Sequence, residues 1–221
     1  MGRIAPPRNM RVFIAAGHGG NDPGSLGGGV YERDEAIKLV NGAVQMLNAI
    51  VPVEHKIIQV PNELALTEGV KYINDNSVIP ISEICLEIHY NNNVGIAGTG
   101  TETWYGYKPL AQTMQTEIVK VLGLTDRGIK DGNNLYFNKN TKPYSALIEM
   151  GFINNRNDLV AVRNKGVIAI VGAICKYLNI SISSVVAPVT ITDNYKTKYE
   201  ELVAKIARTK LEIGWVLDGL K

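Results

Sequence analysis

The chain has 221 residues, of which 45% are hydrophobic and 20% charged, and its formal net charge is +2. This length fits one large domain, alone or with an appendage, and the composition excludes an intrinsically disordered chain. The 23 basic and 21 acidic residues form no block of like charge, so no nucleic-acid partner is expected, and no apolar run is long enough to span a membrane.

Short β-rich runs alternate with amphipathic helical segments from residue 11 to about residue 178. The predicted strands are residues 11–16, 53–60, 84–90, 99–107 and 144–150. Apolar residues at spacings of three and four predict helices at about 34–50, around 66–73, at about 110–121 and at 156–178. The alternation predicts an α/β fold, with a largely parallel sheet covered by helices on both faces.

The ends of the chain differ from this α/β domain, which we expect at residues 11–180. Residues 1–10 form an N-terminal extension without the apolar segment of a secretory signal, so the protein is either made without an export signal or has lost one. A linker is expected at 181–192, followed by a C-terminal amphipathic helix at 193–221. This helix carries an apolar seam: Tyr199, Leu202, Ile206, Thr209, Ile213, Val216 and Leu220. Because such a stripe must be buried, the expected options are packing on the chain's own domain, self-association through residues 195–221, or direct binding to a polymer.

Two of the three histidines lie at predicted strand ends. His18 follows the first strand and His89 lies near the end of the third, whereas His55 is expected to be solvated on a half-exposed strand. Functional residues of open α/β sheets gather at the carboxyl ends of strands, and the same rule marks Glu149 at the end of the last predicted strand. Cys85 sits, like the second cysteine Cys175, inside an apolar run, so both are expected to be buried free thiols.

The stretch AAGHGGNDPGSLGGGVYER connects His18 to a carboxylate, Glu32, through a loop with six glycines between them. Glycine permits the positive-φ turns and close backbone approaches that such a path around a metal ion needs. Two imidazoles and one carboxylate form a common catalytic zinc set, so His18, Glu32 and His89 are candidate ligands. A surface loop without chemical function is the alternative that spacing alone leaves open. No phosphate-binding glycine motif is complete here.

Five separated motifs resemble those of one enzyme family in order and spacing. They are VFIAAGHGGNDPG…YER, EIHYNN, GTETWYG, DRGIK and ALIEMGFINNRNDL, and together they cover about residues 11–178. The sequence resembles zinc-dependent N-acetylmuramoyl-L-alanine amidases of the amidase-3 type. The resemblance implies a mixed six-stranded sheet between helices, and a catalytic domain at residues 11–180. It also implies one zinc ion per chain bound by His18, Glu32 and His89, with Glu149 as the catalytic carboxylate. The implied substrate and partner is peptidoglycan, cleaved between the lactyl group of N-acetylmuramic acid and L-alanine.

One residue departs from the family pattern. Many members have a small hydroxyl residue two positions before the second histidine, where this chain has Glu87. Residues two apart in a strand share a face, so we expect Glu87 to contact the metal ligand His89, with a competing acid or a cleft-lining role as alternatives. Asn91 and the pair Asn133–Asn134 are candidate substrate hydrogen-bonders, although asparagine in loops more often serves a turn.

Two other functions compete with the amidase. A zinc peptidase that cuts peptide crosslinks would use the same metal site, and a wall-binding module that has lost catalysis would keep the fold alone. The four intact positions, His18, Glu32, His89 and Glu149, argue against the second. Without a visible signal peptide, the chain resembles a phage endolysin released from the host cytoplasm more than a secreted autolysin, although a secreted enzyme whose signal is absent from this sequence remains open.

Overall fold

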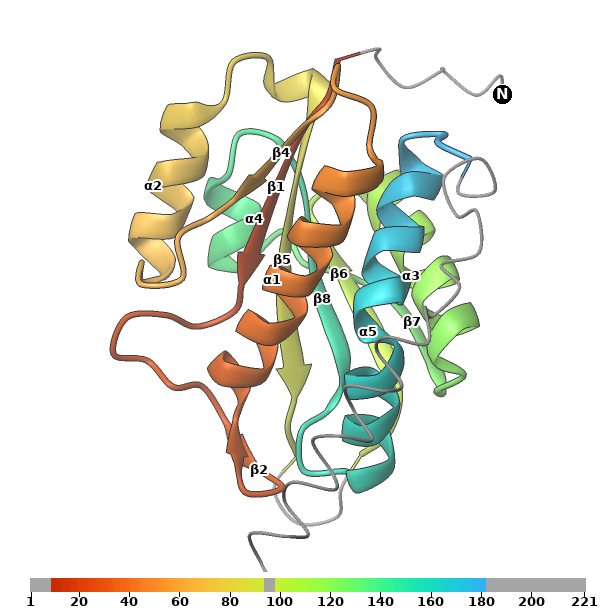
Figure 1. Ribbon diagram of the computed structural model, residues 1–221. Helices are drawn as coiled ribbons and strands as arrows, with labels where there is room; N and C mark the ends of the chain where they lie inside the picture. The colour runs from red at the N-terminus through yellow and green to blue at the C-terminus, as the bar shows by residue number, and fades with distance from the viewer. Residues whose placement is uncertain (1–8, 94–97, 182–221) are drawn as a thin grey trace, which may run out of the picture. The chain divides into compact units, whose positions relative to one another are not determined.

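A six-stranded sheet forms the centre of the fold (Figure 1). The computed structural model describes residues 9–93 and 98–181. In the order they occupy across the sheet, the strands are β4 (Lys56–Gln59), β1 (Arg11–Ala16), β5 (Glu83–Asn91), β8 (Tyr144–Phe152), β6 (Thr101–Tyr105) and β7 (Asp126–Asp131). The first four are parallel, β6 is antiparallel to β8, and β7 is parallel to β6. The predicted mixed, largely parallel sheet is therefore confirmed.

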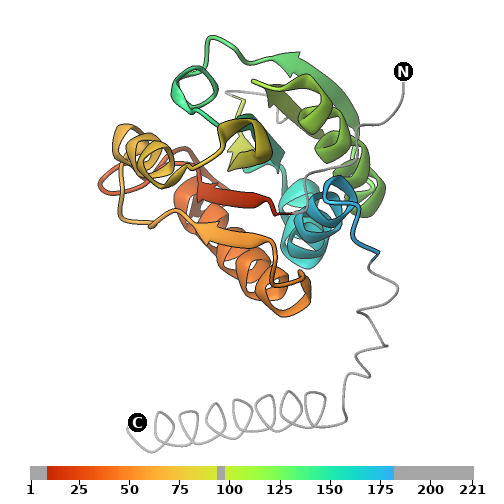
Figure 2. The same ribbon diagram turned by 90° about the horizontal axis from the view of Figure 1, so that it is seen from above.

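Helices cover both faces of the sheet, as predicted. One face packs against α1 (Glu32–Ile50), α3 (Lys108–Leu122) and α5 (Arg156–Tyr177), and the other against α2 (Leu66–Asn76) and the short α4 (Tyr136–Asn140). Figure 2 shows these layers from above. A separate two-stranded ribbon, β2 (Leu26–Gly27) with β3 (Val30–Tyr31), precedes α1, and a short 3-10 helix, η1 (Pro80–Ser82), precedes β5.

The central strands are apolar on both sides because both of their faces are buried. In β1, Val12 and Ile14 pack into the core beneath α1 and α5, whereas Phe13 and Ala15 pack into the core beneath α2. A continuous apolar run is the pattern typical of such a strand. Both cysteines are buried and free, as predicted, and burial raises the pKa of Cys85 to about 12.

The two edge strands, β7 and β4, are where the sequence prediction differs from the structure. Strand β7 was not predicted, because the run DRGIKD is polar and only half buried, without an apolar alternation. The strand expected at 53–60 begins only at Lys56, since the preceding residues form a turn closed by a hydrogen bond from the His55 amide to the carbonyl of Pro52. His55 is not simply solvated, because it is half-buried and its Nδ1 accepts a hydrogen bond of 3.2 Å from the amide of Met10.

The predicted N-terminal extension, linker and C-terminal helix lie outside the described residues, apart from residues 9, 10 and 181. Within the part of the chain that the structure describes, none of the helices has both the length and the apolar character needed to cross a membrane.

An ion pair joins α1 to α5. Arg163 donates from Nε and Nη2 to the two carboxylate oxygens of Glu35, at 2.7 and 2.9 Å. Nζ of Lys38 also donates to Oε1 of Glu35, at 2.6 Å. The side chain of Glu35 is only 2% exposed, so its charge depends on these partners. The guanidinium of Arg163 holds the pKa of Glu35 below its usual range.

We expect Arg163→Gln to lower the free energy of unfolding by about 1–3 kcal/mol at pH 7, because a buried carboxylate loses a charged partner. Since the folded-state pKa of Glu35 is depressed, the ion pair contributes fully above the ordinary pKa of 4.5, and its contribution is lost as pH falls through the folded-state value. Denaturant titrations at pH 7 and at lower pH measure the difference. Lys165→Gln, an exposed change on the same helix, is the control; an equal loss in both variants would contradict the prediction.

Candidate metal centre

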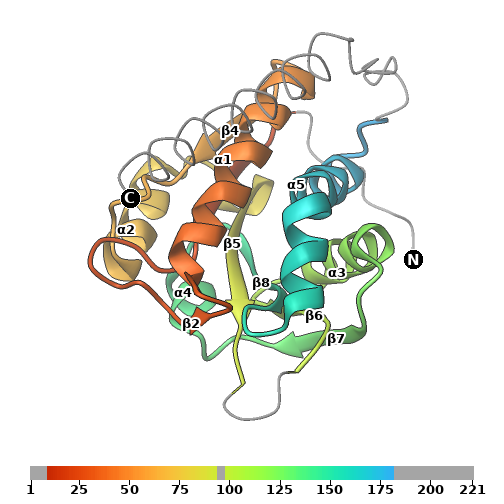
Figure 3. The ribbon, with the colours of Figure 1, turned by 60° about the horizontal axis from the view of Figure 1, so that its bottom comes forward.

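Three segments bring their side chains together at one end of the sheet. His18 follows β1, Glu32 is the first residue of α1, and His89 lies near the end of β5. The loop that leaves β1 swings outward, and the ribbon labelled β2 then returns toward the end of β5 (Figure 3). One ligand atom from each of the three residues lies within 4.8 Å of the other two. The sequence-predicted set therefore converges in space.

The carboxylate of Glu32 lies between the two imidazoles. Its Oε2 is 3.1 Å from Nε2 of His18, and its Oε1 is 2.9 Å from Nδ1 of His89. Two backbone amides hold the same carboxylate, Ser25 donating at 3.1 Å and Tyr90 at 3.0 Å. Burial alone raises the pKa of Glu32, but the hydrogen bonds with His18 and His89 outweigh it and hold that pKa well below its ordinary range. Glu32 is therefore a fixed, ionised carboxylate between the two imidazoles.

Glycines let the loop pass close to both imidazoles. A Cβ atom at Gly17 would collide with the ring of His89, and one at Gly24 would lie 2.5 Å from Cδ2 of His18. Gly24 also has a φ of +65°, and His18 itself has a φ of +63°, which is uncommon for a residue with a side chain. The glycines thus serve the geometry of the site, as the sequence analysis expected for a ligand-bearing loop.

A carboxylate that the sequence analysis did not single out orients His18. Nδ1 of His18 is 2.8 Å from Oδ2 of Asp22, and Oδ1 of Asp22 accepts from the amide of Gly24 at 3.0 Å. A carboxylate on one ring nitrogen selects the tautomer that presents the other as a ligand. The only sequence signal was an aspartate four residues after the histidine in the same loop.

Glu149 lies on β8, directly beside the metal-ligand candidate of the neighbouring strand. His89 and Glu149 are register partners, so their side chains leave the same face of the sheet. Oε2 of Glu149 is buried and has no hydrogen-bond partner among the described residues. Burial raises the pKa of Glu149 to about 7. A carboxyl group with this pKa beside a cluster of metal-ligand type has the character expected of a proton-transfer group.

The remaining predicted site residues divide into two groups. Glu87 is buried, with Oε2 3.2 Å from Nε2 of His89, so it lies beside the ligand candidate as expected. Asn91 donates from Nδ2 to Glu102 Oε1 at 3.1 Å, also at this end of the sheet. Asn133, in contrast, binds Asp131 through both its amide and its Nδ2, at 3.0 and 2.8 Å, which is a turn interaction.

The fold and this cluster define a zinc hydrolase of the α/β class, since two histidines and a glutamate at the strand ends are a catalytic zinc set. Comparison with known families makes the assignment specific. The family model described as N-acetylmuramoyl-L-alanine amidase matches residues 12–179, well over half of the chain. The chain belongs to this family of zinc-dependent peptidoglycan amidases. The resemblance inferred from the five sequence motifs is thereby confirmed.

Individual relatives agree with the family assignment. The chain is 30% identical over 162 residues to the uncharacterized protein YqiI of Bacillus subtilis, covering 69% of this chain and 75% of YqiI. It is 30% identical over 156 residues to the N-acetylmuramoyl-L-alanine amidase LytC of the same organism, covering 66% of this chain but only 30% of LytC. The crystal structure of N-acetylmuramoyl-L-alanine amidase from Clostridium difficile 630 superimposes with a TM-score of 0.66 at 27% identity, covering 78% of this chain and 98% of that one.

We expect Gly24→Ala to weaken zinc binding by about 10- to 100-fold, because the added methyl group displaces the ring of His18 from its place beside Glu32. Gly29→Ala is the matched control, since Gly29 has a φ of +80° in the same loop but no atom within 4 Å of the added Cβ. Competition with a chelator measures both affinities. Equal weakening in the two variants would mean that general loop strain, and not the contact with His18, causes the loss.

Proposed function

We propose that this chain hydrolyses the amide bond between the lactyl group of N-acetylmuramic acid and L-alanine in peptidoglycan. His18, Glu32 and His89 act as the zinc ligands and Glu149 as the catalytic acid and base. The observation that carries the proposal is the register of β5 and β8, which holds a carboxyl of raised pKa beside the two-histidine, one-glutamate cluster.

The charges around the cluster fit a divalent cation. Glu32 and Glu87 are 3% and 5% exposed, and Glu149 is partly buried, so three carboxyl groups surround two imidazoles with little access to water. A cation held among these groups would pair with buried carboxylates whose charge is otherwise costly away from water. Oε2 of Glu149 is buried without a hydrogen-bond partner among the described residues, so the site has binding capacity that its own side chains leave unused. Glu87 contacts His89 and so serves, in this proposal, to orient a ligand.

Zinc in such a site supplies Lewis acidity, which activates water and polarises a carbonyl oxygen. Glu149 takes a proton from the water that attacks the amide carbon, and then donates it to the departing nitrogen of L-alanine. An amine leaves poorly without that proton. Burial raises the pKa of Glu149, and a carboxyl of raised pKa can hold the proton between the two half-steps.

Two alternatives use the same site or the same fold. A zinc peptidase would cut a crosslink within the stem peptide, and the family membership supports the amidase over this reaction. A wall-binding module without catalysis would have no use for the orphaned, buried carboxylate oxygen of Glu149.

Digestion of purified peptidoglycan tests the bond that is cut. We expect mass spectrometry of the products to show free lactyl groups on N-acetylmuramic acid and new N-terminal alanine on the released peptides. New amines inside the stem or crosslink peptides, with intact lactyl amides, would instead identify a peptidase.

We expect Glu149→Gln to retain the fold and the zinc while losing about 10²- to 10⁴-fold in hydrolysis, because glutamine cannot accept or donate the proton. His89→Ala is the companion variant and is expected to lose zinc as well as activity. Elemental analysis and digestion rates are measured on both. Loss of zinc from Glu149→Gln would make Glu149 a ligand or a structural residue and overturn its assigned role.

We further propose that the enzyme acts at the cell wall, either as a phage lysin or as a secreted hydrolase, and that residues 195–221 mediate self-association. The heptad seam of that segment motivates the second proposal, and the segment lies outside the described residues. Light scattering compares the full chain with a chain that ends at residue 182. A monomer in both cases would exclude self-association through the segment.

A further inference from the structure

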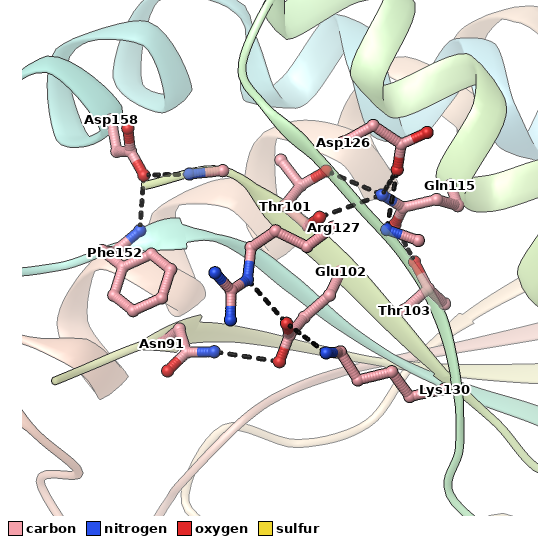
Figure 4. A network of polar contacts seen from close by, with 12 residues as sticks. Asn91, Thr101, Glu102, Thr103, Gln115, Asp126, Arg127, Lys130, Phe152 and Asp158 are labelled. Atoms are coloured by element: carbon pink, nitrogen blue, oxygen red, sulfur yellow. Dashed lines mark hydrogen bonds and ion pairs between the residues drawn. The ribbon is translucent and has the colours of Figure 1, made fainter. Parts of the chain in front are cut away.

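Beside Glu149, a single buried carboxylate holds two cations. Glu102 is 3% exposed, and its Oε2 accepts from Nε of Arg127 at 2.7 Å and lies 3.2 Å from Nζ of Lys130. Its Oε1 accepts from Asn91, so both oxygens are occupied. Figure 4 shows Arg127 and Asn91 approaching the carboxylate of Glu102 from one side and Lys130 from the other.

The cluster carries more positive charge than its own carboxylate needs. One cation neutralises Glu102, and the second leaves a net charge of about +1 at neutral pH. The acidic residues at the two ends of β7 are engaged elsewhere: Asp126 accepts from Gln115 and Gly128, and Asp131 accepts from Asn133. Within the described ranges, neither forms an ion pair with the two cations. The surplus charge is therefore available to a bound anion.

The guanidinium of Arg127 is held in place by its neighbours, while its two terminal nitrogens remain available to bind a ligand. Its Nε binds Glu102, and its carbon lies 5.0 Å from the ring centroid of Phe152, which restrains its plane. The two terminal nitrogens have no hydrogen-bond partner among the described residues, and the side chain is 35% exposed. Lys130 is equally exposed, with Nζ 5.7 Å from the ring centroid of Trp104. A planar pair of donors matches a carboxylate, and the anchoring reduces the entropy lost on binding.

The register of the sheet sets the distance between the two cations and Glu149. Glu102 is the partner of Glu149 in the antiparallel pair of β6 and β8, so the two side chains share a face. On the next strand, Lys130 is the register partner of Trp104. The side chain of Trp104 leaves the same face of the sheet as that of Glu102, because the two residues are two positions apart in β6. Because neighbouring strands are about 4.8 Å apart, an anion held by Arg127 and Lys130 would lie roughly 5–10 Å from Glu149. That span is about one to two residues of an extended peptide.

We propose that Arg127 and Lys130 form a subsite for a free carboxylate of the stem peptide, on the residue that follows the L-alanine released by cleavage. This inference rests on the proposed amidase activity, which sets L-alanine nitrogen beside Glu149. The second stem residue is a glutamate linked through its side-chain carboxyl, so its α-carboxyl is either free or amidated. The subsite selects the free carboxylate. A carboxamide has no negative charge, and it cannot accept two parallel hydrogen bonds from the guanidinium of Arg127.

The test uses the zinc-loaded full chain and two soluble substrates, N-acetylmuramyl-L-alanyl-D-isoglutamate and its D-isoglutamine counterpart. We expect kcat/KM to favour the carboxylate substrate by about 10- to 100-fold, as one charge-assisted contact predicts. Arg127→Gln should abolish the preference by raising KM for the carboxylate substrate alone. Arg127→Lys should restore part of it, and Lys130→Gln, which leaves the Arg127–Glu102 ion pair intact, should reduce it. Lys165→Gln is the charge-matched control and should change neither substrate.

The outcomes separate the subsite from the reaction itself. Equal kcat/KM for the two substrates in the unmodified chain, with lactyl and alanine products from both, would overturn the subsite and leave the amidase standing. Equal losses on both substrates in Arg127→Gln and Lys130→Gln, with zinc retained, would make the pair structural and also overturn it. Absence of those products from both substrates would instead contradict the proposed function.

Discussion

The buried carboxylate of Glu32 is the point on which the site depends. It receives one imidazole from the loop after β1, another from β5, and backbone amides from both Ser25 and Tyr90. Because it is also the first residue of α1, its location is set by the packing of that helix against the sheet. A shift of α1 would move the carboxylate away from both histidines at once, so the stability of the core and the geometry of the metal centre are coupled.

A second constraint is the reversal of direction between β8 and β6. Because β5 and β8 are parallel, His89 and Glu149 lie at the same end of the sheet. The antiparallel strand β6 then places Glu102 opposite Glu149. His89, Glu149 and Glu102 with its two cations therefore follow one another across a single face. Carboxylates next to the histidines and cations beyond Glu102 give this face a gradient of charge, which suits a substrate with a scissile amide at one end and an anionic group further along.

Much of this protein followed from the sequence by itself. The apolar runs of β1, β5 and β8 are strong signals because strands buried on both faces must be apolar throughout, and the alternation with helices then leaves few topologies. The strand ends and the glycine-rich loop marked His18, Glu32, His89 and Glu149 as candidates. The resemblance of the five motifs to the amidase family then assigned their expected roles.

Only the tertiary structure decided which side chains surround the two histidines and two glutamates of the candidate site. Asp22 and Arg127 lie in polar segments whose composition is also that of ordinary loops and edge strands, and β7 itself has no apolar period to reveal it. Glu102 lies in the predicted strand β6, but its local sequence does not reveal that it pairs with two cations. Their partners are set by strand pairing between residues far apart in the chain: Arg127 reaches Glu102 across β6 and β7, and Glu102 reaches Asn91 across the sheet. The sequence by itself therefore determined the layered fold and which histidines and glutamate meet at the candidate metal centre. The charge arrangement around them depended on long-range register, which no local pattern encodes.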